Sequence, residues 1–405
     1  MRISSSTLYT VSVATLNKQE YKLLQTQQQL ASGRRMLTPA DDPAAAARAL
    51  DVSQADAVNT QYGKNLDTAK SYLSLSEGTL QSVTDLLQYI QTKAASAGNM
   101  TLSNSDRALI ATDIQGKLDE LKGLANSTDG TGNYLFSGFQ GKTQPFIDTT
   151  TGVQYAGDAG QRLIQGSASR QISISDSGAD IFMRIKNGNG TFTTQAAAAN
   201  TGSSLVSLDT VINPALLTGN SYQLTFNVAA GATTYDVMNT TTGLPVSTGT
   251  PYVSGQQITF DGMQLIIQGV PASGDQFTVV PSTSESVFKT ISDLVATLNS
   301  PVTPSVVAST TAFTAALSSA QNGLDRSLNS VLTTRASLGA RLNEVDALQS
   351  TGDDLGLQHK QTLSLLQDLD YNKAITDLTQ RQTSLQAAQK SYLQVQNMSI
   401  FNYIS

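Results

Sequence analysis

The chain of 405 residues contains no cysteine, no tryptophan and a single histidine, His359. Without cysteine it can form neither a disulfide framework nor a thiolate metal site. One histidine leaves little scope for zinc or general-base chemistry. Charged residues make up only 14% of the chain, and the formal net charge is −6. We therefore expect no catalytic residue, cofactor or metal, and neither nucleic acid nor membrane as a partner.

Long apolar runs are also missing. No stretch of about 18 apolar residues occurs, so no transmembrane helix is expected. The first twenty residues carry one basic residue before Lys18 and no continuous apolar stretch. They are therefore not expected to act as a cleavable secretory signal.

Proline and glycine divide the sequence into three parts. Proline is absent from residues 44–144 and after Pro304, whereas twenty of the thirty glycines fall between Gly130 and Gly274. Proline is excluded from helix interiors, and glycine marks turns. The predicted fold class is α+β: an antiparallel bundle of long helices formed by both ends of the chain, with an inserted antiparallel β domain. We expect the domains 1–42 with 360–405, 43–144 with 284–359, and 145–283.

Three apolar seams repeat every 3.5 residues, as in helices that wind against other helices. The first comprises eight of nine positions, Ser76 being the exception: Leu66, Ala69, Leu73, Leu80, Val83, Leu87, Ile90 and Ala94. The second, interrupted by Arg335, comprises Leu324, Leu328, Val331, Leu338, Leu342 and Val345. The third, interrupted by Arg381, comprises Tyr371, Ala374, Leu378, Leu385, Ala388, Tyr392 and Val395. The predicted helical core is Leu73, Leu80, Val83, Leu87, Ile90, Leu328, Val331, Leu338, Leu342 and Val345.

Local signals place the helix ends and strands. A first helix ends at Ser32-Gly33, with Glu20 and Gln27 filling heptad positions between its leucines. Asp42 is predicted to cap a helix that begins at Pro43 and breaks at Gly98. Further helices are expected over about 105–125 and from about 286 almost to the end. Alternating residues predict strands at 171–175, 222–228, 264–267 and 275–281.

Three separated motifs resemble those of bacterial flagellins and flagellar hook-associated proteins. They are Gln29-Leu-Ala-Ser-Gly-Arg-Arg35 followed by Pro39-Ala-Asp-Asp-Pro43, then Arg335-Ala-Ser-Leu-Gly-Ala-Arg-Leu342, then Leu369-Asp-Tyr-Asn-Lys-Ala374. The segment Asn133-Tyr-Leu-Phe-Ser-Gly-Phe139 and the two chain ends favour the type 3 hook-associated family, whose members lie at the hook–filament junction. The alternatives are filament flagellin and, from another class, a surface adhesin with a coiled-coil stalk.

The resemblance implies a non-enzymatic subunit that forms a ring of identical copies between a hook-side junction protein and flagellin. It implies secretion through the flagellar type III export channel to the extracellular flagellum, and a cytoplasmic export chaperone on the C-terminal helices. Family members line the inner tube with their terminal helices. The assembly interface is therefore expected at Leu8, Val13, Leu16, Leu23, Leu30, Arg34, Asp41, Asp42, Leu378, Leu385, Tyr392, Val395, Phe401 and Ile404.

The terminal segments are expected to be marginal as isolated helices. For the N-terminal segment, ordering about 23 residues costs roughly what its apolar burial and helical hydrogen bonds return. The hypothesis is that residues 1 to about 40 and about 360 to 405 become ordered mainly on assembly.

Other features admit two interpretations. Arg34, Arg35, Asp41 and Asp42 form either a charged interface or a solvated turn. His359 lies close to Asp353 and Asp354, but no nucleophile-elbow motif accompanies it, so a solvated histidine is favoured over a catalytic one. Asp129-Gly-Thr-Gly132 has too few carboxylates for a calcium loop and is expected to be a turn. The Thr/Gly-rich middle is either a binding surface or, as we favour, a spacer.

Overall fold

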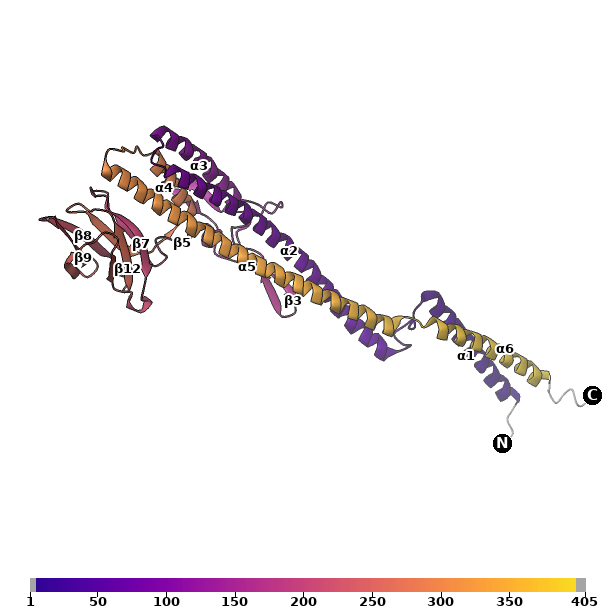
Figure 1. The fold of residues 1–405 in the computed structure, drawn as a ribbon. Helices are drawn as coiled ribbons and strands as arrows, with labels where there is room; N and C mark the ends of the chain where they lie inside the picture. Colours follow the sequence, from indigo (N-terminus) through magenta and orange to yellow (C-terminus); the bar gives the residue numbers. More distant parts are fainter. Residues whose placement is uncertain (1–4, 398–405) are drawn as a thin grey trace, which may run out of the picture. The chain divides into compact units, whose positions relative to one another are not determined.

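The computed structural model describes residues 5–397 (Figure 1). Residues 1–4 and 398–405 lie outside that description, as do the side chains at positions 5, 6, 8, 208 and 395–397. The chain divides into two compact units, one formed by 1–65 with 347–405 and the other by 66–346. The division falls inside α2 (Pro43–Ala97) and α5 (Val307–Gln367), whereas the sequence placed the boundaries at 42/43, in a connector, and at 359/360, which also lies inside α5. The segment expected as a β domain lies within the second unit.

Six α-helices are present among the described residues: α1 (Ser5–Ser32), α2 (Pro43–Ala97), α3 (Asn104–Ala125), α4 (Val287–Asn299), α5 (Val307–Gln367) and α6 (Tyr371–Asn397). Between α3 and α4 all paired strands are antiparallel. The predicted α+β class, long helices from both chain ends with an inserted β region, is confirmed. None of the described helices is both long and apolar enough to cross a membrane.

Capping side chains fix where the helices begin. Asp42 Oδ1 accepts a hydrogen bond from the Ala45 backbone N–H (3.0 Å), as predicted. Ser103 and Asp106 form a reciprocal capping box at the start of α3. Just inside α3, Arg107 is 2% exposed and donates to the carbonyls of Ala97 and Asn99 at the end of α2. Its guanidinium therefore supplies donors to carbonyls that the end of α2 leaves unpaired.

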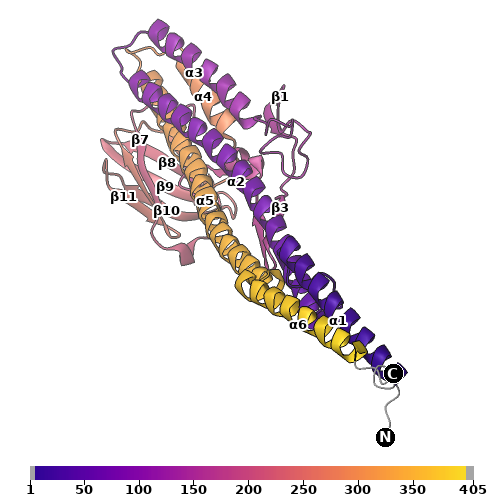
Figure 2. The ribbon, with the colours of Figure 1, turned by 90° about the vertical axis from the view of Figure 1, so that its right-hand side faces the viewer.

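In the second unit, the seam of α2 is buried along its whole length. The nine positions from Leu66 to Ala94 are each at most 5% exposed, including the polar Ser76. Figures 1 and 2 show this part of α2 beside α5, with α3 and α4 packed nearby. Cross-helix pairs join Lys70 to Asp346 (2.7 Å) and Gln91 to Asp325 (2.6 Å), so α2 and α5 run antiparallel.

The buried seam of α5 takes a three-residue step after Leu324, where a four-residue step was expected. Its buried positions are Phe313, Leu317, Ala320, Leu324, Ser327, Val331, Leu338 and Val345. Ser327, fully buried, occupies the position expected for Leu328, and its hydroxyl donates to the Gly323 carbonyl. Leu328 and Leu342 are half-buried.

The strands fall into five antiparallel sheets. The small pairs are β1 (Phe146–Thr149) with β2 (Gly152–Tyr155), β3 (Leu163–Ser167) with β4 (Arg170–Ser173), and β5 (Ile185–Lys186) with β14 (Ser284–Glu285). A π-helix, η1 (Ala179–Met183), precedes β5. Phe146, Phe182 and Phe288 form an aromatic cluster with ring centroids 5.2–6.0 Å apart. This cluster packs β1 and η1 onto α4.

The two larger sheets share one apolar core. A five-stranded sheet has the order β10-β9-β8-β13-β6 and a three-stranded sheet the order β11-β12-β7. Their bounds are β6 (Phe192–Ala196), β7 (Leu205–Val211), β8 (Tyr222–Ala229), β9 (Ala232–Asn239), β10 (Leu244–Pro251), β11 (Gln257–Phe260), β12 (Met263–Gln268) and β13 (Gln276–Pro281), with a 3-10 turn η2 (Pro214–Leu216) between β7 and β8. Phe226, Leu265 and Phe277, from both sheets, are fully buried in this core.

Asp129 organises the loop that leaves α3. Its carboxylate accepts hydrogen bonds from the Thr131 and Asn133 backbone N–H groups, from both of those side chains, and from the Tyr72 hydroxyl (2.8–3.0 Å). Burial alone would raise the pKa of Asp129, but the hydrogen bonds from Asn133 and Thr131 outweigh it and hold the pKa far below its usual range. Five protein donors already fill the carboxylate, which favours the turn over a calcium loop.

Asp129→Asn is predicted to lower the free energy of unfolding by about 2 kcal/mol at pH 7, because the neutral amide cannot accept the full donor set. The pKa is lower in the folded state, so the carboxylate stabilises the fold above about pH 4 and progressively less as pH falls further. The difference between wild type and variant, measured by urea denaturation, should therefore shrink from pH 7 to pH 3. Asp148→Asn, at an exposed partner of Lys122, is the control and should change stability by less than about 0.5 kcal/mol. A difference that stays constant with pH would contradict this role of Asp129.

Candidate functional site

In the first unit, α1 and α6 pack side by side in both views (Figures 1 and 2). The rings of Tyr9 and Tyr392 are 6.0 Å apart, and Arg381 Nη1 donates to the Lys22 carbonyl (2.8 Å). The two helices are therefore antiparallel. The facing apolar side chains are half-buried rather than buried: Val13, Leu16, Leu23 and Leu30 on α1, and Leu378, Leu385 and Tyr392 on α6.

The polar positions of the α1 seam differ from those expected. Gln19 and Thr26 turn inward, whereas Glu20 and Gln27 are exposed. Thr26 is 2% exposed, and its hydroxyl donates to the Lys22 carbonyl one turn earlier. The seam leucines are seven residues apart, and the inward position between two of them can lie three or four residues after the first. In α1 it lies three residues after, at Gln19 and Thr26.

The predicted interface residues at the chain termini are only partly described. Leu8 and Val395 lie within α1 and α6, but their side chains are outside the described set. Phe401 and Ile404 lie outside the described residues altogether.

The connectors between the helices of this unit bind each other. The Leu369 N–H donates to the Gly33 carbonyl (2.9 Å), and the Arg35 N–H donates to the Gln367 carbonyl (2.8 Å). Arg35 Nη2 also donates to the Leu366 carbonyl (2.9 Å). A cation at the end of α5 satisfies carbonyls that the helix leaves unpaired. Two of the recognised motifs thus meet at one joint.

The acidic residues of the N-terminal motif shape its turn. Asp41 Oδ2 accepts hydrogen bonds from the Leu37 and Thr38 backbone N–H groups, each 2.9 Å long. The Thr38 and Leu37 N–H groups lower the pKa of Asp41. Asp42 caps α2 and lies 3.5 Å from Arg35. Only Arg34 has an exposed side chain without such a role, its backbone bridging to Asp368.

The arginines of the C-terminal motif bind within the second unit. Arg335 pairs with Glu77 of α2 (2.6 Å) and also donates to the Thr84 hydroxyl. Arg341 Nη2 contacts both carboxylate oxygens of Asp176 at 2.8 Å, and both side chains are largely buried. These residues hold α5 to α2 and to the segment after β4.

The histidine lies in a helix contact of the first unit. His359 Nδ1 is 3.8 Å from Asp56 Oδ1, whereas Asp353 and Asp354 are exposed. Nearby, Asn59 Nδ2 donates to the Gly352 carbonyl (2.7 Å). Within residues 5–397, no group of three metal-ligating side chains was found. Asp56 lies on α2 and His359 on α5, so this pair belongs to a helix–helix contact.

The helices of the first unit carry exposed apolar side chains, and all of them except Tyr371 had escaped the sequence reasoning. They are Tyr9, Val11, Tyr21, Leu24, Leu50, Val58, Leu355, Leu357, Leu365, Tyr371, Ile375 and Leu393. Tyr21 and Leu24 are 68% and 54% exposed, and Ile375 is 51% exposed. Tyr371 is a correction, because the sequence placed it in the third seam and it is 53% exposed. The signal of the others was an apolar residue outside the heptad positions. Together with the half-buried seam, they leave this unit incompletely covered by its own chain.

Comparison with known proteins places these features in a family. The family model for the bacterial flagellin N-terminal helical region matches residues 3–141. Flagellar hook-associated protein 3 of Escherichia coli (strain K12) is 31% identical over 401 residues, covering 99% of both chains. Phase 1 flagellin of Salmonella naestved is 29% identical over 135 residues, only 33% of this chain and 27% of that protein.

Solved structures agree with this result. The crystal structure of Xanthomonas campestris FlgL (space group C2) has a TM-score of 0.70 and 33% identity, covering 77% of this chain and 99% of that one. Hook-associated protein-3 of Legionella pneumophila has a TM-score of 0.72 and 32% identity, covering 78% and 98%. The chain is thus a structural subunit of the bacterial flagellum and not an enzyme. It belongs to the flagellar hook-associated protein 3 family. The predicted preference for a junction protein over filament flagellin is confirmed, because the flagellin match is partial.

Gly33→Ala is predicted to lower stability by about 1–2 kcal/mol, because Gly33 has φ +67° and an added Cβ would lie 2.9 Å from the Tyr371 hydroxyl. The measurement is urea denaturation together with hydrogen exchange of the Leu369 amide, which should accelerate. Gly63→Ala is the control in the same unit, since no atom lies within 4 Å of its added Cβ. It should raise stability by about 0.5–1 kcal/mol. Equal effects of the two substitutions would show that the joint does not depend on the Gly33 conformation.

Proposed function

We propose that this chain forms a ring of identical subunits at the junction between hook and filament, with a hook-side junction protein and flagellin as axial neighbours. The relative matched over 99% of both chains is a flagellar hook-associated protein, which supports this role. The observation that carries it is the α1–α6 pair of the first unit: two antiparallel helices whose seam is half-buried and whose outer faces bear exposed apolar residues.

The terminal helices are the proposed contact surface. Burying one exposed leucine or tyrosine on a neighbouring subunit contributes about 1.5–3 kcal/mol. Several such side chains per subunit, repeated around a ring, would exceed the cost of association. The half-buried residues Val13, Leu16, Leu23, Leu30, Leu378, Leu385 and Tyr392 would become fully covered, and the exposed Arg34 would lie at the edge of this surface.

The second unit is proposed to act as the stable body of the subunit. Its seam is already buried within one chain, so it needs no neighbour to fold. The β region at 145–283 would then face outward as a spacer. A subunit whose second unit has a buried core and whose first unit still exposes apolar residues can add to a ring without rearranging that core.

Export and chaperone binding complete the proposal. We propose that the chain leaves the cell through the flagellar export channel and that a cytoplasmic chaperone first covers the C-terminal helices. The absence of cysteine fits passage of an unfolded chain, since no disulfide can form and block threading. Exposed apolar residues on α6, such as Ile375 and Leu393, would need cover before export.

The double substitution Leu24→Glu with Ile375→Glu is predicted to abolish assembly while leaving the monomer folded, because both side chains are more than half exposed. The measurement is complementation of a strain deleted for its own junction protein, scored by motility, hooks seen in electron micrographs and flagellin shed into the medium. Wild type should restore filaments, and the variant should leave bare hooks with shed flagellin. Leu109→Glu, at a 71% exposed position of α3, is the control and should complement. Normal filaments in the double variant would refute the proposed surface.

The ordering hypothesis has its own test. We propose that α1 and α6 gain most of their stability on assembly, since their seam stays half-buried in a single chain. Amide hydrogen exchange of the purified monomer should then show weak protection in both helices. The α2 seam from Leu66 to Ala94 serves as the internal reference and should exchange slowly. Comparable slow exchange in α1 and α6 would show that these helices are already stable in the monomer.

A further inference from the structure

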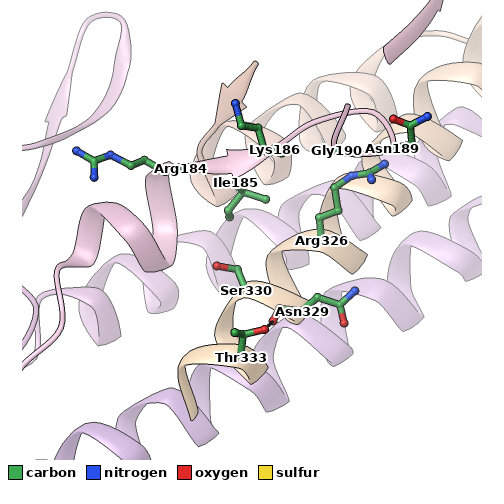
Figure 3. Close-up of a pocket in the computed structure, with 9 residues that line it drawn as sticks. All are labelled: Arg184, Ile185, Lys186, Asn189, Gly190, Arg326, Asn329, Ser330 and Thr333. Carbon is green, nitrogen blue, oxygen red and sulfur yellow. Dashed lines mark hydrogen bonds between the residues drawn. The ribbon is translucent and has the colours of Figure 1, made fainter. Parts of the chain in front are cut away.

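A cleft of about 330 Å³ lies in the second unit between α5 and the turn that follows β5 (Figure 3). Its lining mixes cations with the hydroxyl and amide oxygens of α5. Arg184 pairs with Asp180, and in Figure 3 the Lys186 ammonium points away from Arg326. The lining side chains therefore do not converge on one ligand. A more selective arrangement lies elsewhere in this unit, at the turn between α2 and α3.

The buried cation at this turn has only weak acceptors. Arg107 is 2% exposed. Its guanidinium donates to the carbonyls of Ala97 (3.5 Å) and Asn99 (3.3 Å) and to the side-chain oxygen of Asn104 (3.4 Å). All three distances exceed the usual N–H···O length of about 2.9 Å. The donors of Arg107 are therefore engaged but weakly bound.

The surroundings of this charge hold no close counterion. None of the ion pairs found within residues 5–397 includes Arg107. The adjacent Asp106 caps α3, and its pKa is lowered mainly by hydrogen bonds from Ser103, with a smaller contribution from the charge of Arg107. The Phe313 ring, whose centroid lies 4.8 Å from Arg107 Cζ, attracts the cation but accepts no strong hydrogen bond. A further strong acceptor would therefore improve the binding of this guanidinium.

Met100 carries the atom on which such an acceptor forms by oxidation. Its sulfur lies 3.9 Å from Arg107 Nη2, and the residue is 42% exposed. A thioether sulfur is a weak acceptor, whereas methionine sulfoxide carries a polar oxygen. With an S–O bond of about 1.5 Å and an angle of about 120° at the oxygen, an oxygen directed toward Nη2 lies about 2.9 Å from it, the usual hydrogen-bond length. Oxidation thus supplies a well-placed acceptor without any movement of the backbone.

We propose that Met100 is an oxidation site whose sulfoxide accepts a hydrogen bond from the Arg107 guanidinium and thereby tightens the turn between α2 and α3. The oxidant is a peroxide. The sulfur lone pair attacks one oxygen of hydrogen peroxide, the O–O bond breaks, and the other oxygen leaves as water after proton transfer. The thioether is oxidised by two electrons and the peroxide is reduced by two. The proposal concerns the second unit alone and is independent of ring formation.

Met238 on β9 provides a matched control. It is 44% exposed, close to the value for Met100. Its partners on the neighbouring strands are Gln223 and Pro245, so no cation faces it across the sheet. Met263, 4% exposed in the β core, is the reference for a protected sulfur. Peroxide should therefore oxidise Met100 and Met238 at similar rates and Met263 much more slowly.

The test is partial oxidation of the folded full chain with hydrogen peroxide, followed by amide hydrogen exchange read by peptide mass spectrometry. The added oxygen separates oxidised from unoxidised peptides of the same sample by mass. The N–H groups of Asn99 and Leu102 are hydrogen-bonded within the turn and report its opening. The peptide 97–107 should exchange about tenfold more slowly when it carries the sulfoxide. Oxidation of Met238 should change the exchange of its own peptide by less than about twofold.

Two substitutions test the same hydrogen bond without an oxidant. Met100→Gln places an amide carbonyl where the sulfoxide would form, and it should slow the exchange of the turn relative to Met100→Leu, which offers no acceptor. Asn99, Met100 and Thr101 are all exposed, so both variants should fold. Oxidation of Met100 no faster than that of Met263 would overturn the proposal. So would a sulfoxide that leaves the exchange of the turn unchanged or accelerates it, or equal exchange in the two variants.

Discussion

The antiparallel contact between α2 and α5 is the constraint on which the second unit depends. The two helices come from opposite ends of the sequence, and their seams are buried from Leu66 to Ala94 and from Phe313 to Val345. Everything between them is an insertion whose two ends are fixed by this contact. Closing so long an insertion costs little more than closing a short one, since the entropy grows only with the logarithm of its length. The β region could therefore diverge in size or topology without loss of the helical core.

The α1–α6 pair of the first unit has the same seven-residue spacing, but its seam is less completely buried. Its seam carries polar Gln19 and Thr26 on one side and Arg381 on the other, and two helices alone leave their contact open to solvent. The contrast between the units lies in how much cover each seam receives, because both seams repeat at the same spacing. A seam without a third layer is a weak fold for a monomer and a suitable surface for neighbouring copies.

Period, proline and glycine sufficed to predict the ends of α1, α2 and α3 and the α+β class, since these depend on neighbours in sequence. The breaks between α4, α5 and α6 were not predicted. The choice of Ser327 over Leu328, and of Thr26 over Gln27, could not be predicted. Each depends on which face of the helix the rest of the fold covers, which no local pattern contains. The placement of β13 between β8 and β6 is equally non-local.

Apart from Arg34, the charged residues of the N-terminal motif and the arginines of the Arg335–Leu342 motif serve the fold of their own chain. Arg35 binds the end of α5, Asp41 and Asp42 order the turn before α2, and Arg341 holds Asp176. Side chains so engaged have few donors or acceptors left for a neighbouring subunit. Such motifs identify a shared architecture and cannot by themselves decide which partner is chosen. Discrimination between partners must then come from groups the fold leaves unused, chiefly the exposed apolar residues of α1 and α6. Since those positions, apart from Tyr371, lie outside both the motifs and the heptads, a junction protein and a flagellin can share the motifs and still differ in the surfaces they present.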